Sequence, residues 1–89
     1  MISRTSADLR RDFASLPSTV QRQAREAYQL FKANPQHSSL RFKELSGYQD
    51  IWSVRITTDY RAIGRLRAGV IVWFFIGSHA DYDKIIARI

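Results

Sequence analysis

The sequence contains no cysteine, which excludes disulfide bonds, thiolate catalysis and cysteine-ligated zinc. Long apolar runs are also missing, because the longest, Val70–Ile76, has seven residues, whereas a membrane-spanning helix needs about 20. The chain turns polar and charged directly after Ile2, unlike a secretory signal peptide. These absences predict a protein of the reducing cytoplasm that does not enter a membrane.

Acidic residues are scarce. Eight Asp and Glu residues stand against fourteen Lys and Arg residues, which gives a net charge of +6, and eleven of the fourteen are arginine. The planar arginine side chain donates two hydrogen bonds to one phosphate and also stacks on nucleobases. The composition therefore indicates a polyanionic partner such as a nucleic acid, although a basic protein without such a partner would carry the same charge.

Length and periodicity predict one domain over residues 1–89 that begins with two helices. A chain of 89 residues buries little more than about 60% of its unfolded surface and has no material for a second core. Apolar residues at steps of three and four predict a first helix from Thr5 to Leu16, with Thr5 as its cap. A longer helix is expected to follow, capped by Ser18 and stopped at Asn34. The short connection between them favours an antiparallel hairpin.

From Leu40 onward the apolar residues recur with a period of two, which is typical of strands. Four strands and a final helix are expected, over Leu40–Leu45, Trp52–Ile56, Tyr60–Arg67, Val70–Ile76 and Asp81–Ile89. The predicted fold class is therefore α+β. A helical hairpin at the amino terminus packs on an antiparallel sheet of about four strands, and a short helix ends the chain.

The alternation also predicts a basic face on this sheet. Arg41 and Lys43 share one parity, as do Arg61 and Arg65, and Arg55 lies opposite the apolar residues of its strand. If these parities are in register, the side chains line a groove that can follow a phosphate backbone. The alternative is that they are solvated strand residues without a ligand.

One of the two histidines, His79, directly follows the apolar strand, and Tyr82 comes three residues later. An imidazole can donate or accept a proton near neutral pH, and a phenol can hydrogen-bond to a phosphate. The alternative is that His79 occupies the first turn of a helix capped by Ser78 and that Tyr82 packs against the sheet. Asp81 and Asp83 are better explained by the helix dipole than by a metal site.

Several motifs follow one another in a fixed order along the chain: Leu45-Ser46-Gly47, Trp52-Ser53-Val54-Arg55-Ile56, Asp59-Tyr60-Arg61 and Gly77-Ser78-His79-Ala80-Asp81-Tyr82. Together with the preceding helices, they resemble the RelE/ParE superfamily of toxins from bacterial type II toxin–antitoxin systems. The resemblance covers nearly the whole chain. It implies a toxin that is neutralised by a cognate antitoxin protein. Many members of this superfamily are metal-free endonucleases that cleave messenger RNA in the ribosome.

The resemblance also implies roles for individual residues. Arg61 matches the arginine that stabilises the reacting phosphate, and Arg55 matches a basic residue of the preceding strand. His79 matches the position where RNA-cleaving relatives carry a histidine or arginine, and Tyr82 lies near a tyrosine of several relatives. Lys43 matches a basic position before the Ser-Gly turn. These residues would cleave RNA by 2′-hydroxyl attack on the adjacent phosphate, without a small-molecule cofactor or metal.

Some positions depart from the pattern, and the alternatives remain open. Ser53 stands where some relatives carry a lysine, so the general base is not identified. One branch of the superfamily inhibits DNA gyrase and cleaves no RNA, and a third alternative is an inert member that only binds its antitoxin. The expected partners of the endonuclease are the antitoxin, the ribosome and messenger RNA.

Overall fold

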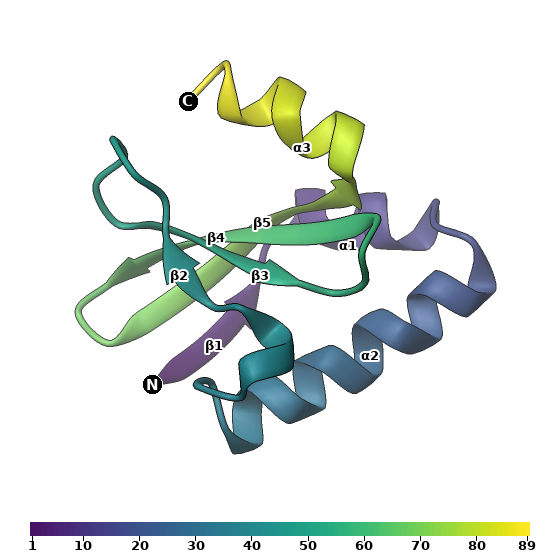
Figure 1. Cartoon of the computed structure of the whole chain (residues 1–89), viewed down its shortest axis with the longest axis horizontal. Coiled ribbons are helices and arrows are strands. Elements are labelled where there is room, and N and C mark those ends of the chain that lie inside the picture. Colours follow the sequence, from purple (N-terminus) through teal and green to yellow (C-terminus); the bar gives the residue numbers. More distant parts are fainter.

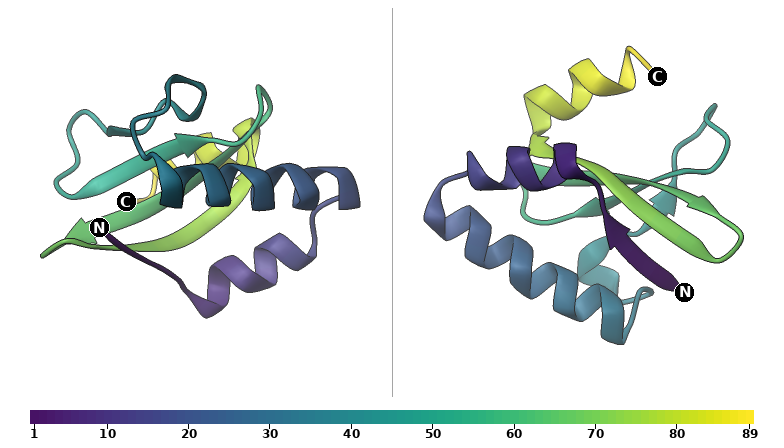
Figure 2. Two further views of the ribbon diagram at one scale, coloured as in Figure 1. Left: turned by 90° about the horizontal axis from the view of Figure 1, so that it is seen from below. Right: turned by 180° about the vertical axis from the view of Figure 1, so that it is seen from behind.

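The computed structural model describes all residues, 1–89, and shows a five-stranded sheet with helices on both faces (Figures 1 and 2). The strand order is β1-β5-β4-β3-β2. In chain order the elements are β1 (Ile2–Thr5), α1 (Ala7–Ala14), α2 (Ser18–Ala33), a short 3-10 helix (Ser38–Leu40), β2 (Lys43–Glu44), β3 (Ile51–Arg55), β4 (Tyr60–Arg67), β5 (Val70–Ser78) and α3 (His79–Ile86).

The α+β class, the helical hairpin and a short final helix confirm the prediction, although α3 spans His79–Ile86 rather than Asp81–Ile89 because it begins directly after its cap, Ser78. The sheet has one more strand than expected. The additional strand, β1, pairs in parallel with β5, so the sheet is mixed rather than purely antiparallel. Thr5 therefore ends a strand instead of capping a helix. Ser6 caps α1, because its hydroxyl accepts a hydrogen bond from the Leu9 amide at 3.1 Å.

Two further boundaries differ from the expectation. Ser18 does not cap α2, which starts behind Pro17 without a side-chain cap. Instead, the side-chain amide of Gln21 donates from Nε2 to the carbonyl of Leu16 at 3.0 Å and so ties the start of α2 to the loop after α1. The expected strand Leu40–Leu45 is shortened to β2, because Arg41 takes a left-handed backbone conformation (φ 47°) after the 3-10 helix.

The two faces of the sheet carry separate apolar clusters. The larger cluster packs beneath α1 and α2 and includes Phe31, Trp73 and Ile76. The smaller cluster lies on the opposite face, where α3 covers Ile63 and Phe75. Burying both faces explains why β5 reads as a nearly continuous apolar run. None of the three α-helices has the length and the hydrophobicity that a membrane-spanning segment requires.

A β-bulge in β5 allows this strand to place large apolar side chains in both clusters. Ile63 of β4 pairs with Phe75, but the next residue, Gly64, pairs with Trp73, so Phe74 is an extra residue without a partner. Phe74 and Phe75 consequently both contact the cluster under α3, while Trp73 and Ile76 face α1 and α2.

We expect Gly64→Ala to destabilise the sheet, because an added Cβ would lie 2.8 Å from Cε3 of Trp73 and 2.9 Å from Cγ1 of Ile71. Both neighbours are buried core residues with little room to move. The expected loss in the free energy of unfolding is about 1–3 kcal/mol. Urea denaturation followed by circular dichroism measures it, and an unchanged midpoint would contradict this packing of Trp73 across Gly64.

Candidate functional site

Arg55 and Arg61 lie directly opposite each other on β3 and β4, and Gly77 of β5 continues the same cross-strand row. Neither arginine forms a salt bridge with a carboxylate. Like charges that face each other across strands are destabilising unless an anion balances them. The pair therefore has the geometry and the charge to hold one phosphate between two neighbouring cations.

The β3–β4 turn fixes both guanidinium groups. Arg61 donates from Nη1 to the Thr57 carbonyl oxygen at 2.9 Å, and Arg55 donates from Nη2 to the Thr58 hydroxyl at 3.0 Å. Arg61 and Arg55 are both half-buried, which limits the conformations of their side chains. The remaining N–H groups of each guanidinium are available to donate hydrogen bonds to a ligand.

His79 begins α3 beside the same turn. Its backbone amide donates to the carbonyl of Asp59 at 2.7 Å, and Ser78 caps the helix as expected by accepting from the Asp81 amide at 3.2 Å. The imidazole is 56% exposed and its Nε2 lies 3.7 Å from Oδ2 of Asp83. It also stacks on Tyr82, with 5.8 Å between the ring centroids. The ring is therefore accessible to a substrate and oriented by two neighbours of its own helix.

The turn Thr57–Asp59 thus bonds to three residues that we call the basic cluster: to the side chains of Arg55 and Arg61, and to the backbone amide of His79. Tyr82 lies at the margin of this cluster, half-buried against the apolar residues under α3. Three of the four candidate catalytic residues therefore converge on one short turn, although they are up to 24 positions apart in the sequence.

The candidate RNA-binding residues are more dispersed. Lys43 is exposed on β2 opposite Ser53, and the exposed Arg65 places its guanidinium 5.8 Å from the centroid of the Phe74 ring. Arg41 lies outside the sheet after the 3-10 helix, so its predicted strand parity was wrong. The basic residues of that face do not adjoin one another throughout, because the apolar cluster around Ile63, under α3, occupies its middle.

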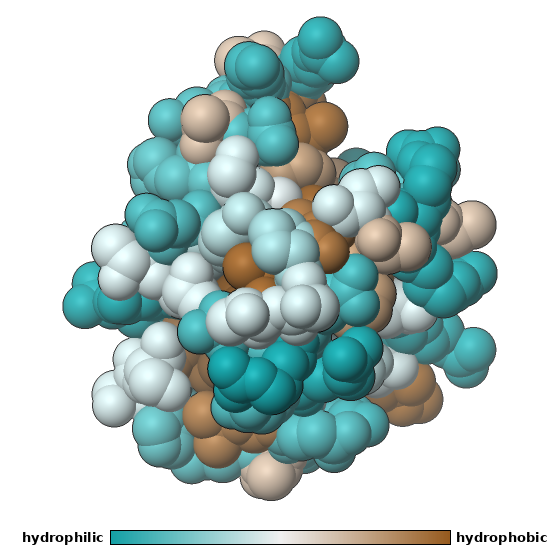
Figure 3. All heavy atoms as spheres, turned by 90° about the vertical axis from the view of Figure 1, so that its right-hand side faces the viewer, coloured by the Kyte–Doolittle hydropathy of each residue, from teal (hydrophilic) through white to brown (hydrophobic).

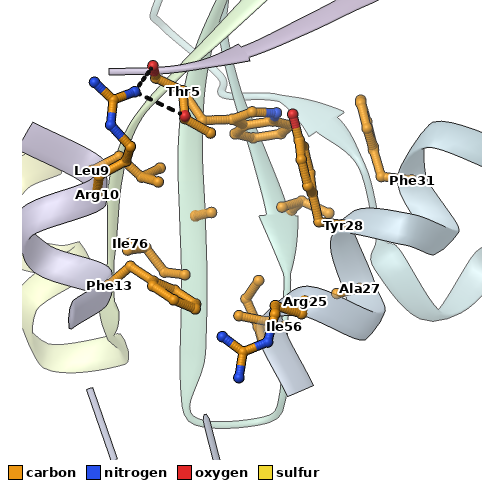
Figure 4. A pocket seen from close by; sticks show the side chains of 14 residues that line it. Thr5, Leu9, Arg10, Phe13, Arg25, Ala27, Tyr28, Phe31, Ile56 and Ile76 are labelled. Carbon is orange, nitrogen blue, oxygen red and sulfur yellow. Dashed lines mark hydrogen bonds between the residues drawn. The ribbon is translucent and has the colours of Figure 1, made fainter. Parts of the chain in front are cut away.

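A second feature, which the sequence did not reveal, is an apolar cleft of about 210 Å³ between α1, α2 and the sheet (Figure 4). Eleven of its fourteen lining residues are hydrophobic, and Phe13 and Tyr28 approach it from the two helices. Two arginines stand at its rim. Arg10 hydrogen-bonds to the Thr5 hydroxyl at 3.1 Å, and the guanidinium of Arg25 lies 5.4 Å from the centroid of the Phe13 ring.

Amphipathic periodicity predicted that the two helices face the sheet, but not that they leave a cleft open. From the side where the β3–β4 turn and α2 lie, hydrophobic atoms are visible in openings between hydrophilic side chains (Figure 3). Protein interiors are normally close-packed, so an apolar opening of this size in a small protein suggests a surface that a partner covers. No group of three or more His, Asp or Glu side chains is arranged to hold a metal ion.

Comparisons with known proteins place these features in a family. A family model described as a ParE-like toxin domain matches residues 18–84. The match includes α2, β2–β5 and most of α3, and so contains the whole basic cluster. A search of curated protein sequences gave no match.

Several solved structures share the fold at low sequence identity. A chain of the RelB–RelE antitoxin–toxin complex from Methanococcus jannaschii superimposes with a TM-score of 0.75 at 11% identity, covering 92% of this chain and 96% of its own. The DinJ–YafQ toxin–antitoxin complex from Escherichia coli gives 0.71 at 14% identity, with coverage of 89% and 92%. The RelBE2 toxin–antitoxin complex from Mycobacterium tuberculosis gives 0.68 at 20% identity, with coverage of 88% and 96%.

Proposed function

Because this chain belongs to the ParE-like toxins of the RelE/ParE superfamily and is thus the toxin of a toxin–antitoxin system, we propose that it cleaves messenger RNA on translating ribosomes. The observation that supports cleavage is the convergence of Arg55, Arg61 and His79 on the turn Thr57–Asp59. Two arginines without a carboxylate partner and an exposed imidazole, attached to the same turn, are the kinds of group that phosphoryl chemistry on RNA requires.

In the proposed reaction, the ribose 2′-oxygen attacks the adjacent phosphorus while the bond to the 5′-oxygen breaks. The products are a 2′,3′-cyclic phosphate and a free 5′-hydroxyl. The proton of the 2′-hydroxyl passes to a base, and an acid returns a proton to the departing 5′-oxygen. Arg55 and Arg61 stabilise the charge that develops on the phosphorane, since their donors are already oriented by the turn.

His79 serves as the general acid or general base in this scheme. Its ring is exposed and can therefore reach the hydroxyl groups of a bound RNA. Tyr82, stacked against His79, contributes a contact to the phosphate or to a base of the RNA. No other titratable side chain is assigned as the second proton-transfer group.

Primer extension on a reporter messenger RNA in cell-free translation tests this function. The wild-type protein is expected to create new 5′ ends within codons only while ribosomes translate, and His79→Ala is expected to weaken them strongly. Intact RNA at every protein concentration would contradict the proposal. Inhibition of gyrase supercoiling by the same preparation would then assign the chain to the gyrase-inhibiting branch.

We also propose that the cognate antitoxin occupies the apolar cleft between α1 and α2. An amphipathic segment can place its apolar side chains in such a groove. Acidic residues beside them would complement Arg10 and Arg25 at the rim. The solved RelB–RelE and DinJ–YafQ structures are complexes of a toxin with its antitoxin, which supports a partner of this kind.

Arg25→Glu is therefore expected to weaken antitoxin binding by about tenfold, because it places a negative charge at the rim of the cleft. Isothermal titration with the co-expressed and separated antitoxin measures the dissociation constant. The matched control is Arg88→Glu, an exposed arginine near the end of the chain. Equal affinities of the two variants would contradict the placement of the antitoxin in this cleft.

A further inference from the structure

A second cleft, of about 230 Å³, lies between α2, the 3-10 helix and the end of β3. It exists because β2 is only two residues long. β2 pairs with Trp52 and Ser53 and leaves the edge of β3 beyond them unpaired. Arg55 lies at this free edge and is one of the residues that line the cleft.

The lining combines hydrophobic residues with polar and charged ones. Ala27, Leu30 and Ile56 are among its hydrophobic residues, while Gln23 and Glu26 come from adjacent turns of α2. A carboxamide offers a donor and an acceptor side by side, the arrangement that binds the N6 and N7 edge of adenine. Glu26 adds an acceptor, and its Oε1 is held by Arg22 at 2.9 Å.

The size of this cleft suits one planar ring system. It is smaller than the roughly 300–1,000 Å³ that is typical of sites for drug-sized ligands. Proteins bind unstacked RNA bases through contacts to the ring faces and hydrogen bonds along the ring edges, and a lining of mixed apolar and polar residues can supply both.

The cleft adjoins the basic cluster through two shared residues. Arg55 lines the cleft and is also the cross-strand neighbour of Arg61. Thr57 lines the cleft as well, and its carbonyl oxygen accepts the hydrogen bond from Arg61. A phosphate held between the two arginines would therefore lie beside residues that also line this cleft, at the free edge of β3.

We propose that this cleft binds a nucleobase of the messenger RNA next to the cleaved phosphate, and that Gln23 selects adenine there. The inference rests on the proposed ribonuclease function and adds the residue that determines base preference. Gln23 is a specificity residue in this scheme and takes no part in proton transfer.

Mapping of 5′ ends across a transcript library in cell-free translation tests the proposal. Wild-type protein is expected to favour adenine at one fixed position beside the cut. Gln23→Ala should still cleave but lose this preference by about 5- to 100-fold, the discrimination of one bidentate base contact. Gln23→Glu, which keeps only acceptors, should shift the preference towards cytosine. Gln29→Ala, an exposed glutamine of the same helix, should leave the profile unchanged.

The outcomes separate this inference from the function on which it rests. Wild-type cleavage with an unchanged base profile in Gln23→Ala would overturn the base-binding cleft and leave the ribonuclease in place. A uniform loss of cleavage in that variant, without a change of preference, would also overturn it, because the residue would then serve structure. Absence of cleavage by the wild-type protein would overturn both proposals.

Discussion

Replacing Arg61 by alanine is expected to lower the rate of messenger RNA cleavage by about 100- to 1,000-fold, the usual effect of removing one oriented donor from a developing negative charge. The side chain is half-buried, is held by the Thr57 carbonyl at 2.9 Å and lies opposite Arg55. Single-turnover cleavage on programmed ribosomes, at saturating protein, measures the chemical step separately from ribosome binding.

Arg61→Lys and Arg11→Ala complete this experiment. Lysine keeps the charge but not the planar fork, so Arg61→Lys should recover only part of the activity. Arg11 is 71% exposed on α1, away from the turn, and its removal should leave the rate unchanged. A rate for Arg61→Ala equal to that of Arg11→Ala would contradict the assignment of Arg61 to phosphate stabilisation.

Trp73→Ala is expected to cause the largest loss of stability, about 3–5 kcal/mol of unfolding free energy. Trp73 is 3% exposed and packs edge-on against Phe31, with 5.2 Å between the ring centroids. Its indole N–H donates to the Ser3 hydroxyl at 3.0 Å, which in turn donates to Tyr28 at 2.9 Å. This residue therefore joins β1, β5 and α2 at one point.

Urea denaturation followed by circular dichroism measures this loss of stability. Two further variants serve as a control and as a measure of the hydrogen-bond contribution. Val72→Ala changes the neighbouring residue, whose side chain is 37% exposed on the other face, and should alter stability by no more than about 0.5 kcal/mol. Ser3→Ala removes the shared hydroxyl and should cost about 1–3 kcal/mol, because it leaves the indole N–H without its partner. A Trp73→Ala midpoint similar to that of Val72→Ala would contradict the central position of Trp73 in the core.

The elements with strong periodicity could be predicted from the sequence. The apolar stripe of α2 and the alternation of β3 and β4 each carry enough signal on their own. The strand β1 could not be predicted in this way, because Ile2-Ser3-Arg4-Thr5 has only one strongly apolar residue and becomes a strand by pairing with β5, far along the chain. Its formation depends on tertiary contacts rather than on local propensity.

The same distinction applies to the site. The alternation of side chains along β3 and β4 correctly predicted that Arg55 and Arg61 lie on one face of the sheet. Both strands are regular in this region, and their pairing has no register shift between these residues. Parity failed for Arg41, because a left-handed backbone conformation ends the alternation before β2. The contacts of the β3–β4 turn with Arg55, Arg61 and His79 depend on backbone carbonyls and a hydroxyl, which no residue pattern specifies.

The bulge at Phe74 has a consequence for sequence alignment. It adds one residue to β5 without changing which face its other side chains occupy, so a strand without Phe74 would form a regular ladder with β4. A relative with that regular strand aligns correctly with this chain only if a gap is opened at Phe74. Without the gap, every following position is displaced by one, and His79 and Tyr82 are matched to residues that occupy other places on α3.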